Sequence, residues 1–317
     1  MLTLLDVTIR DGGYVNGHTW TVEQAVSIVG AVARAGVPLI EVGYLRTPTG
    51  GDARPTARCE AGYLAAVAAA AGPAGLVVMI RPGEVEPAAT ADAAAGGVRL
   101  ARLLAPRLDV AQTAPYLAAA RAAGLATSVN LTHVSRFAPE QLAESAGRAA
   151  GLGADYVYLA DSNGSMYPQD VLPRVEAVAA AVARESGALV GFHAHDNLGL
   201  AFANTCAALS AGAAALDASL GGIGKGGGNL AIETAAAHLR ARHGADLRLE
   251  PLLSEHAHEA ALRSMRADGR VGALVAGLLD VSLDQAPEFQ EQVARHGYDA
   301  LLRPAARFDP LGSLSRT

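Results

Sequence analysis

Eight short runs of branched apolar residues alternate with alanine-rich segments along most of this 317-residue chain. The runs lie near residues 3–9, 38–44, 76–81, 98–104, 126–132, 155–160, 189–195 and 214–220. The segments between them, near 21–35, 58–71, 86–95, 109–123, 139–151, 168–186, 198–212 and 229–242, have the composition of helices. Strands that alternate with helices predict an α/β fold with a parallel sheet. Eight such pairs favour a closed (β/α)8 TIM barrel, with a doubly wound open sheet as the alternative.

We expect residues 1–245 to form this barrel as the catalytic domain. Residues 246–317 carry no further strand pattern. We therefore expect a small helical C-terminal extension, with helix over 251–299 and an irregular tail over 303–317.

Several helix ends are marked by their residue types. Thr21 and Gln24 have the spacing of a capping box at the start of the first helix. Gly36, Gly124 and Gly153 stand where helices should end before the next strand, because glycine readily adopts the left-handed backbone found there. These signals support the helical assignment independently of composition.

The composition narrows the classes of function. A net charge of −6 and a pI near 5.8 argue against a surface for nucleic acid or an anionic membrane. The two cysteines, Cys59 and Cys206, are too few for a disulfide framework or a zinc cluster. Apolar segments such as 64–72 are too short to cross a bilayer, and the first strand begins without a signal peptide. We therefore expect a cytoplasmic protein without nucleic-acid or membrane partners.

Two histidines, His193 and His195, follow the apolar run of the seventh strand. Residues i and i+2 of a strand project from the same face, so both imidazoles can converge on one divalent metal ion. Asp11 follows the first strand and is a third candidate ligand, because the strands of such a barrel end at one rim. His256 and His258 have the same spacing inside an expected helix, where they point apart, and we interpret them as surface residues.

Other charged residues gather at the same rim. Arg10 precedes Asp11, and a cation there can stabilise negative charge that develops on a substrate. Glu41 in the second strand can hold Arg10, although an ordinary ion pair at the barrel end is the alternative. The glycine run 221–228 contains Lys225, the only lysine of the chain. We interpret this run as a flexible rim loop or an anion-binding nest rather than a dinucleotide fingerprint.

Five segments at these strand ends resemble the DRE-TIM metallolyase superfamily (HMG-CoA lyase-like), and most of all its 4-hydroxy-2-oxovalerate aldolase branch. They are LDVTIRDG at 5–12, IEVG at 40–43, DSNGSMYP at 161–168, HAHDNLG at 193–199 and GIGKGGGN at 222–229. The segments occur in the family's order and cover most of the expected barrel.

The resemblance implies roles for the residues at the rim. Three residues match the family's metal ligands: Asp11, His193 and His195. The implied ion is Mn²⁺ or Mg²⁺, with Co²⁺ or Zn²⁺ as alternatives. Asn229 matches a loop asparagine that can approach the metal in some members, Arg10 the residue that stabilises an enolate, and Glu41 its partner. The implied activity is that of a class II-type pyruvate aldolase, which forms or cleaves a 4-hydroxy-2-oxo acid through a metal-bound enolate.

The proton-transfer residue departs from the family's pattern. Related aldolases carry a histidine shortly after the Arg-Asp-Gly motif, where this chain has Tyr14 and, four residues later, His18. The acid/base candidates are Tyr14, His18 and His133, with Tyr14 ranked first for its position. Related aldolases also use a tyrosine from the C-terminal helices, and residues 251–297 contain none.

Other functions stay open at this point. A Claisen-type acyl-CoA lyase or synthase can use the same metal site. A Schiff-base aldolase would have to use Lys225, and a non-catalytic barrel would serve as a scaffold that docks a partner. A biotin-dependent carboxyltransferase is disfavoured, because the fourth strand offers Arg99 and Arg102 where such enzymes need a lysine.

The expected partners follow from the implied reaction. A small 2-oxo acid and an aldehyde are the expected substrates. The C-terminal helices are the expected contact surface for a homodimer or for an aldehyde dehydrogenase partner.

Overall fold

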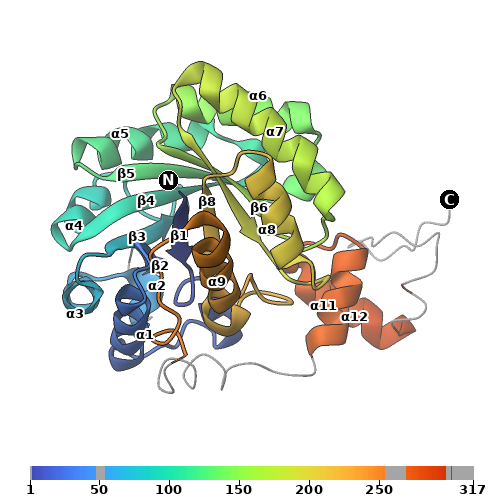
Figure 1. Ribbon diagram of the computed structural model, residues 1–317, viewed down its shortest axis with the longest axis horizontal. Coiled ribbons are helices and arrows are strands. Elements are labelled where there is room, and N and C mark those ends of the chain that lie inside the picture. Colours follow the sequence, from blue (N-terminus) through green and yellow to red (C-terminus); the bar gives the residue numbers. More distant parts are fainter. Residues whose placement is uncertain (1, 48–53, 254–268, 298–300, 302–317) are drawn as a thin grey trace.

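The computed structural model describes residues 2–47, 54–253, 269–297 and 301. Its centre is a closed barrel of eight parallel strands in the order β1 to β8 (Figure 1). The strands are β1 (Thr3–Asp6), β2 (Leu39–Tyr44), β3 (Gly75–Ile80), β4 (Val98–Ala105), β5 (Ala126–Leu131), β6 (Tyr156–Asp161), β7 (Leu189–Ala194) and β8 (Ala215–Ala218). Because β1 pairs with β8 as well as with β2, the sheet has no edge. The predicted (β/α)8 barrel is therefore confirmed, and the alternative of an open sheet is wrong.

Helices cover the outside of the barrel (Figure 1). The α-helices are α1 (Val22–Arg34), α2 (Pro55–Arg58), α3 (Ala61–Ala71), α4 (Ala89–Ala95), α5 (Ala114–Ala122), α6 (Pro139–Gly151), α7 (Pro168–Glu185), α8 (Ala201–Ser210), α9 (Ile232–His243), α11 (Gly269–Leu278) and α12 (Ala286–His296). Short 3₁₀ turns are η1 (Gly12–Val15), η2 (Pro106–Leu108), η3 (Ala111–Thr113), η4 (Val134–Arg136), η5 (Leu220–Gly222) and η6 (Leu283–Gln285). None of the helices in the described ranges is long and apolar enough to span a membrane.

The predicted helix ends agree with the structure. Thr21 and Gln24 form both hydrogen bonds of a capping box at the start of α1. Gly36, Gly124 and Gly153 follow α1, α5 and α6 with φ values of +86°, +77° and +91°. A left-handed residue at these positions lets the chain leave the helix and enter the next strand.

Some element boundaries differ from the prediction. The first strand ends at Asp6 rather than at residue 9, because the Val7 carbonyl accepts from the Asp11 and Gly12 amides and closes a turn. The helix expected over 58–71 begins at Ala61 as α3, because α2 ends at Arg58 and Cys59 follows it in a left-handed conformation (φ +49°).

The C-terminal extension is helical but not continuous. α11 and α12 are separated by a break that contains Asp280 with φ +51° and the turn η6. In Figure 1 both helices lie beside the barrel near α8. Residues 254–268, with His256 and His258, and the whole tail over 303–317 lie outside the described residues. The expected docking of a partner on these helices stays a prediction.

The barrel encloses a polar layer above an apolar one. Leu5, Val77 and Leu100 belong to an apolar cluster inside the strands. Arg102 lies two residues further along β4 than Leu100 and is fully buried, as is Tyr158 in β6. The larger apolar core lies between the strands and the surrounding helices. Buried charges thus lie directly beneath the rim formed by the C-terminal ends of the strands.

Candidate active site

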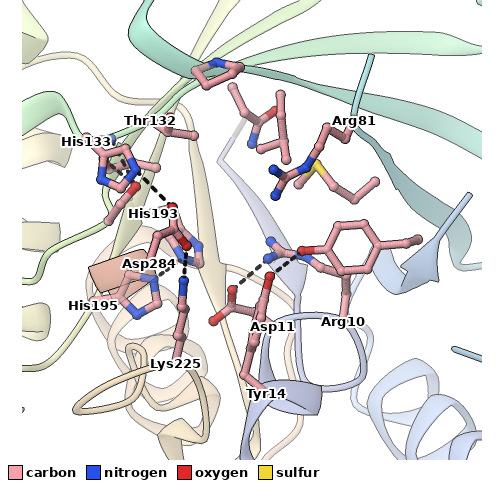
Figure 2. Close-up of a pocket in the computed structure, with 17 residues that line it drawn as sticks. Arg10, Asp11, Tyr14, Arg81, Thr132, His133, His193, His195, Lys225 and Asp284 are labelled. Atoms are coloured by element: carbon pink, nitrogen blue, oxygen red, sulfur yellow. Dashed lines mark hydrogen bonds and ion pairs between the residues drawn. The ribbon is translucent and has the colours of Figure 1, made fainter. Parts of the chain in front are cut away.

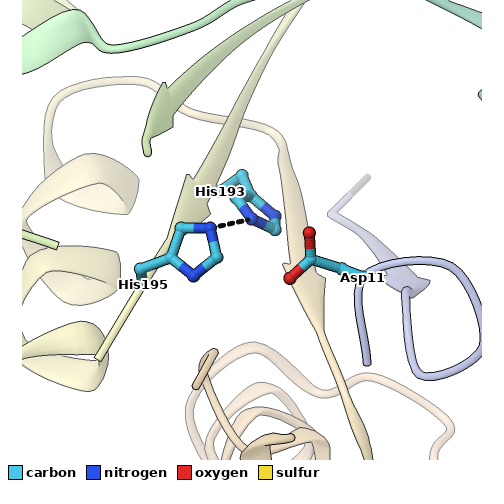
Figure 3. A group of neighbouring side chains, drawn as sticks. All are labelled: Asp11, His193 and His195. Carbon is cyan, nitrogen blue, oxygen red and sulfur yellow. Dashed lines mark hydrogen bonds between the residues drawn. The ribbon is translucent and has the colours of Figure 1, made fainter. Parts of the chain in front are cut away.

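Three side chains converge at this rim, as the sequence predicted (Figure 3). Asp11 lies in the loop after β1, His193 lies near the end of β7, and His195 directly follows that strand. All three are buried, and one ligand atom from each lies within 4.8 Å of the others. The Nε2 atoms of the two histidines are 3.3 Å apart. Nitrogen and carboxylate donors at these mutual distances form a candidate site for a divalent metal ion.

The other ring nitrogen of each histidine is held by an acceptor. His193 Nδ1 lies 2.9 Å from Asp217 Oδ2 in β8, and His195 Nδ1 lies 3.1 Å from the Gly228 carbonyl oxygen. A carboxylate and a carbonyl can only accept, so both Nδ1 atoms carry the proton and donate it. Burial lowers the pKa of His195 to about 4, which keeps this ring neutral. Both Nε2 lone pairs therefore face one point, and this donor set fits a divalent metal ion.

Asp11 is held in its ionised form. Arg10 Nη1 donates to Asp11 Oδ1 over 2.6 Å, and Asn229 Nδ2 donates to Asp11 Oδ2 over 2.9 Å. Burial opposes ionisation, but Arg10, the two histidines and the Asn229 amide together outweigh it and hold the pKa of Asp11 well below its usual range. The buried Oδ1 of Asn229 has no hydrogen-bond partner within the described chain. That amide oxygen is available as a further oxygen ligand.

A chain of buried ion pairs crosses the barrel beneath the rim. Arg10 Nε donates to Glu41 Oε2 over 2.6 Å, which is the pairing expected from the sequence. Glu41 Oε2 lies 3.3 Å from Arg102 Nη1, and Arg102 Nη2 donates to Asp217 Oδ2 over 2.6 Å. Burial opposes ionisation of Asp217, but Arg102 and His193 together outweigh this effect and lower its pKa. The ion pairs therefore connect Arg10 to the carboxylate that holds His193.

Sequence reasoning missed the roles of Arg102 and Asp217. Both are buried charged residues within otherwise apolar strands. That interruption was the available signal, because a buried charge requires a partner of opposite sign. Arg99, also considered in the fourth strand, is exposed near the start of β4.

The first two acid/base candidates differ in their access to the pocket. Tyr14 lines the pocket, and its hydroxyl lies 2.8 Å from that of Tyr44 in β2. Burial and the neighbouring Tyr44 raise the pKa of Tyr14, so its phenol keeps its proton at neutral pH. His18 packs edge-on against Tyr14 with ring centroids 4.9 Å apart, and it does not line the pocket formed by the described residues. Burial lowers the pKa of His18 to about 4.

His133, the third candidate, lines the pocket from the loop after β5. Its Nδ1 lies 3.1 Å from Asn163 Oδ1, and its Nε2 lies 3.7 Å from Asp284 Oδ2. Asp284 belongs to η6 and also accepts from Lys225 Nζ over 2.6 Å. The His133 and Lys225 side chains hold the pKa of Asp284 below its usual range. The extension thus brings an acidic residue to the barrel rim, which the sequence did not predict.

A second carboxylate fastens the extension to the barrel. Asp280 Oδ1 accepts hydrogen bonds from three barrel side chains: Ser135, Asn163 and Ser165. Gly277 in α11 also lies against the loop after β7, where an added Cβ would come within 2.9 Å of Asn197 Cβ. These contacts place η6 and Asp284 at the pocket.

The glycine run after β8 positions Asn229. The amides of four glycines in this run donate to protein acceptors: Gly221, Gly222, Gly227 and Gly228. A Cβ at Gly224 would come within 2.4 Å of Asn229 Nδ2, so only glycine permits this close approach. The alternative of an anion-binding nest is wrong for these four amides, because their hydrogen bonds are already made within the protein.

Figure 2 shows these groups around one pocket at the C-terminal end of the barrel. Arg10, Asp11 and Tyr14 lie on one side, and His133, His193 and His195 lie on another. The wall is completed by residues that sequence reasoning did not select, among them Tyr44, Arg81 and Asp284. The pocket combines a candidate metal site, fixed positive charge and two protic side chains.

The sequence profile of the HMGL-like family matches residues 1–264, which is most of the chain. The chain belongs to the HMGL-like family. It is 36% identical over 244 residues to a 4-hydroxy-2-oxovalerate aldolase from Thermus thermophilus, which covers 74% of this chain and 68% of the relative. It is 35% identical over 242 residues to an oxaloacetate decarboxylase from Mycobacterium tuberculosis, which covers 75% of this chain and 70% of the relative.

A solved structure supports the fold independently. The N-terminal domain of a candidate aldolase from Bacteroides vulgatus superposes with a TM-score of 0.80 at 20% identity, covering 95% of this chain and 99% of that one. This likeness concerns the fold alone. The family profile and the sequence relatives confirm the predicted family and the predicted enzyme class, a carbon–carbon lyase of the aldolase type.

Proposed function

We propose that this HMGL-like protein is a divalent-metal-dependent aldolase whose nucleophile is the enolate of pyruvate or a similar 2-oxo acid. It joins this enolate to an aldehyde, giving a 4-hydroxy-2-oxo acid, and catalyses the reverse cleavage. The observation that carries the proposal is the position of Arg10, fixed between Asp11 of the metal site and Glu41. The similarity to 4-hydroxy-2-oxovalerate aldolases supports the same substrate class.

A metal ion and Arg10 would both stabilise the negative charge that develops on the 2-oxo acid. A divalent ion held by Asp11, His193 and His195, with Mn²⁺ or Mg²⁺ favoured, would supply Lewis-acid stabilisation to the oxygens of the 2-oxo acid. Arg10 contributes fixed positive charge beside this site. Because Glu41 and Asp11 both hold its guanidinium, little reorganisation is needed when negative charge develops on the substrate.

Two side chains are placed for the proton transfers. In the direction of addition, a base removes a methyl proton from the 2-oxo acid, the methyl carbon bonds to the aldehyde carbon, and the aldehyde oxygen gains a proton. We assign the donation to Tyr14, whose phenol lines the pocket in its protonated form. We assign the removal of the methyl proton to His133, which lines the same pocket. In the cleavage direction the two roles reverse.

The alternative of a Schiff-base aldolase receives no support from the structure. The Nζ atom of Lys225 donates to Asp284 over 2.6 Å, whereas a Schiff-base lysine requires an activated amine. Pyruvate followed by borohydride should therefore leave the enzyme active.

A second candidate reaction is favoured by the oxaloacetate decarboxylase relative. Loss of CO₂ from oxaloacetate breaks the C3–C4 bond and leaves its electron pair in the enolate of pyruvate. Protonation of that enolate at C3 then gives pyruvate. The same fixed charge at Arg10 serves both reactions, because both pass through this enolate.

Exchange of the pyruvate methyl protons in D₂O tests enolate formation without requiring the aldehyde. We expect metal-dependent exchange, followed by proton NMR, that falls about 10²–10³-fold in Arg10→Gln, as for loss of a preorganised charge. Arg99→Gln changes the same charge at the start of β4 and serves as the matched control. Exchange that continues at full rate after removal of metal with EDTA would contradict the proposal.

A further inference from the structure

Arg81 occupies a distinct place on the pocket wall. It directly follows β3, and in a closed barrel of eight sequential strands β3 lies four strands from β7 in either direction. Arg81 is therefore across the rim from the strand that carries His193. Its side chain is 49% exposed and lines the pocket. Figure 2 shows its guanidinium pointing from the wall towards the interior.

The other two cations that line the pocket are strongly paired. Arg10 makes 2.6 Å contacts with both Asp11 and Glu41, and Lys225 makes a 2.6 Å contact with Asp284. Arg10 is held beside the candidate metal position and Lys225 is held by Asp284, so neither is placed to bind a substrate group at the wall after β3.

Arg81 is only partly compensated. Its Nε lies 3.3 Å from Glu84 Oε1, while Glu84 Oε2 makes a shorter 2.6 Å contact with Arg46. One carboxylate thus serves two guanidinium groups, and Glu84 does not line the pocket formed by the described residues. The Nη atoms of Arg81 donate no hydrogen bond to another described residue. Among the described residues, Arg46 and Arg81 thus share one carboxylate, and the wall opposite the histidines carries an excess positive charge.

We propose that Arg81 binds a carboxylate of the aldehyde substrate, so that the acceptor is an oxo acid and the product is a 4-hydroxy-2-oxo dicarboxylate. The inference rests on the proposed aldolase function and adds the class of the acceptor. A guanidinium group binds a carboxylate through two parallel N–H···O hydrogen bonds. The single uncompensated charge matches a singly charged carboxylate better than a doubly charged phosphate.

The placement of Arg81 also selects the orientation of the substrate. Asp11, His193 and Arg10 surround the candidate metal position and would hold the 2-oxo acid end. A carboxylate at the other end of the product would reach the wall formed after β3. A neutral aldehyde would leave the Nη donors of Arg81 to water, whereas a carboxylate would pair with them, so the site should favour the acidic acceptor.

The test compares acceptors with and without a carboxylate in pyruvate addition with Mn²⁺. Glyoxylate and succinic semialdehyde are the acidic acceptors, and acetaldehyde and butanal are the neutral ones. We expect kcat/KM of the wild type to be at least 30-fold higher for the better acidic acceptor than for either neutral one. Arg81→Gln should lose roughly 10–100-fold with the acidic acceptor and less than 3-fold with the neutral ones. Arg99→Gln is the matched control and should leave both values unchanged.

Methyl-proton exchange separates failure of this inference from failure of the proposed function. Exchange needs no acceptor, and it should be unchanged in Arg81→Gln, which also shows that the variant folds. Wild-type preference for neutral aldehydes, or an equal loss with both acceptor classes in Arg81→Gln, would overturn the role of Arg81 alone. Absence of metal-dependent exchange in the wild type would overturn both proposals.

Discussion

At the scale of single residues, the site depends on which nitrogen of each histidine carries the proton. Asp217 and the Gly228 carbonyl accept from the Nδ1 atoms of His193 and His195. These two acceptors leave both Nε2 atoms deprotonated and directed at the metal position. A carboxylate that never touches the substrate can therefore control the affinity for the metal.

Replacement of Asp217 by Asn tests this control. Arg102 Nη2 and His193 Nδ1 both contact Asp217 Oδ2, so an amide oxygen at that position would keep both hydrogen bonds but would lose the negative charge that makes His193 a stronger ligand. We expect the affinity for Mn²⁺, measured by isothermal titration calorimetry, to fall about 10–100-fold. Asp92→Asn, on the exposed side of α4, should leave the affinity unchanged. An unchanged Kd in Asp217→Asn would show that the negative charge of Asp217 does not control the affinity for the metal.

At the scale of elements, the side chains that point into the barrel from each strand determine where the layer of buried charges lies along the barrel axis. Gly191 in β7 faces Tyr158 in β6, and an added Cβ would come within 2.5 Å of the tyrosine ring. That ring lies under the Arg102 guanidinium, 4.3 Å from its centroid. Because Gly191 has no side chain, the Tyr158 ring fits inside the barrel and supports the ion pairs beneath the candidate metal site.

Gly191→Ala should disturb both stability and metal binding. Overpacking of the barrel interior is expected to lower the free energy of unfolding by about 1–3 kcal/mol, measured by urea denaturation. The shift of Tyr158 and Arg102 should also weaken Mn²⁺ binding. Gly62→Ala is the matched control: nothing lies within 4 Å of its added Cβ in α3, so it should stabilise the protein by about 0.5–1 kcal/mol. An unfolding free energy that does not change in Gly191→Ala would show that the ring has space to move.

At the scale of the whole molecule, the site joins the first and seventh strands. Asp11 and the two histidines meet only because β1 pairs with β8 and closes the barrel. The extension then fastens over the same rim through Asp280 and brings Asp284 to the pocket. Metal binding should therefore stabilise the closed barrel as a unit.

Bound metal should raise the melting temperature. At a Mn²⁺ concentration of about 100 Kd, linkage gives about 2.7 kcal/mol of added stability, or a rise of roughly 5 °C. The rise, measured by differential scanning calorimetry after EDTA dialysis and readdition of metal, should vanish in a His193→Asn, His195→Asn double variant. His296→Asn, at the exposed end of α12, should keep it. A rise that survives in the double variant would place the ion elsewhere in the molecule.

Much of this arrangement could be predicted from residue spacing. The period of strands predicted that His193 and His195 share a face, and the common rim of a barrel predicted that Asp11 joins them. The pairing of Arg10 with Glu41 was expected for the same reason. Boundaries were less accurate: the break at Asp280 and the early end of β1 depend on local hydrogen bonds that periodicity does not encode.

The sequence alone determined the order of strands and helices, the charge of the chain and the residues that can bind metal, because these follow from local pattern and chemistry. Only the tertiary structure decided which side chains meet across the barrel. Two of these contacts join residues that are distant in the sequence: Asp217 with His193, and Asp284 with His133. The partly compensated charge of Arg81 depends on which side chains face the same space. Such contacts depend on barrel closure and on the direction of each side chain. Neither can be predicted from the residue spacing within a single segment.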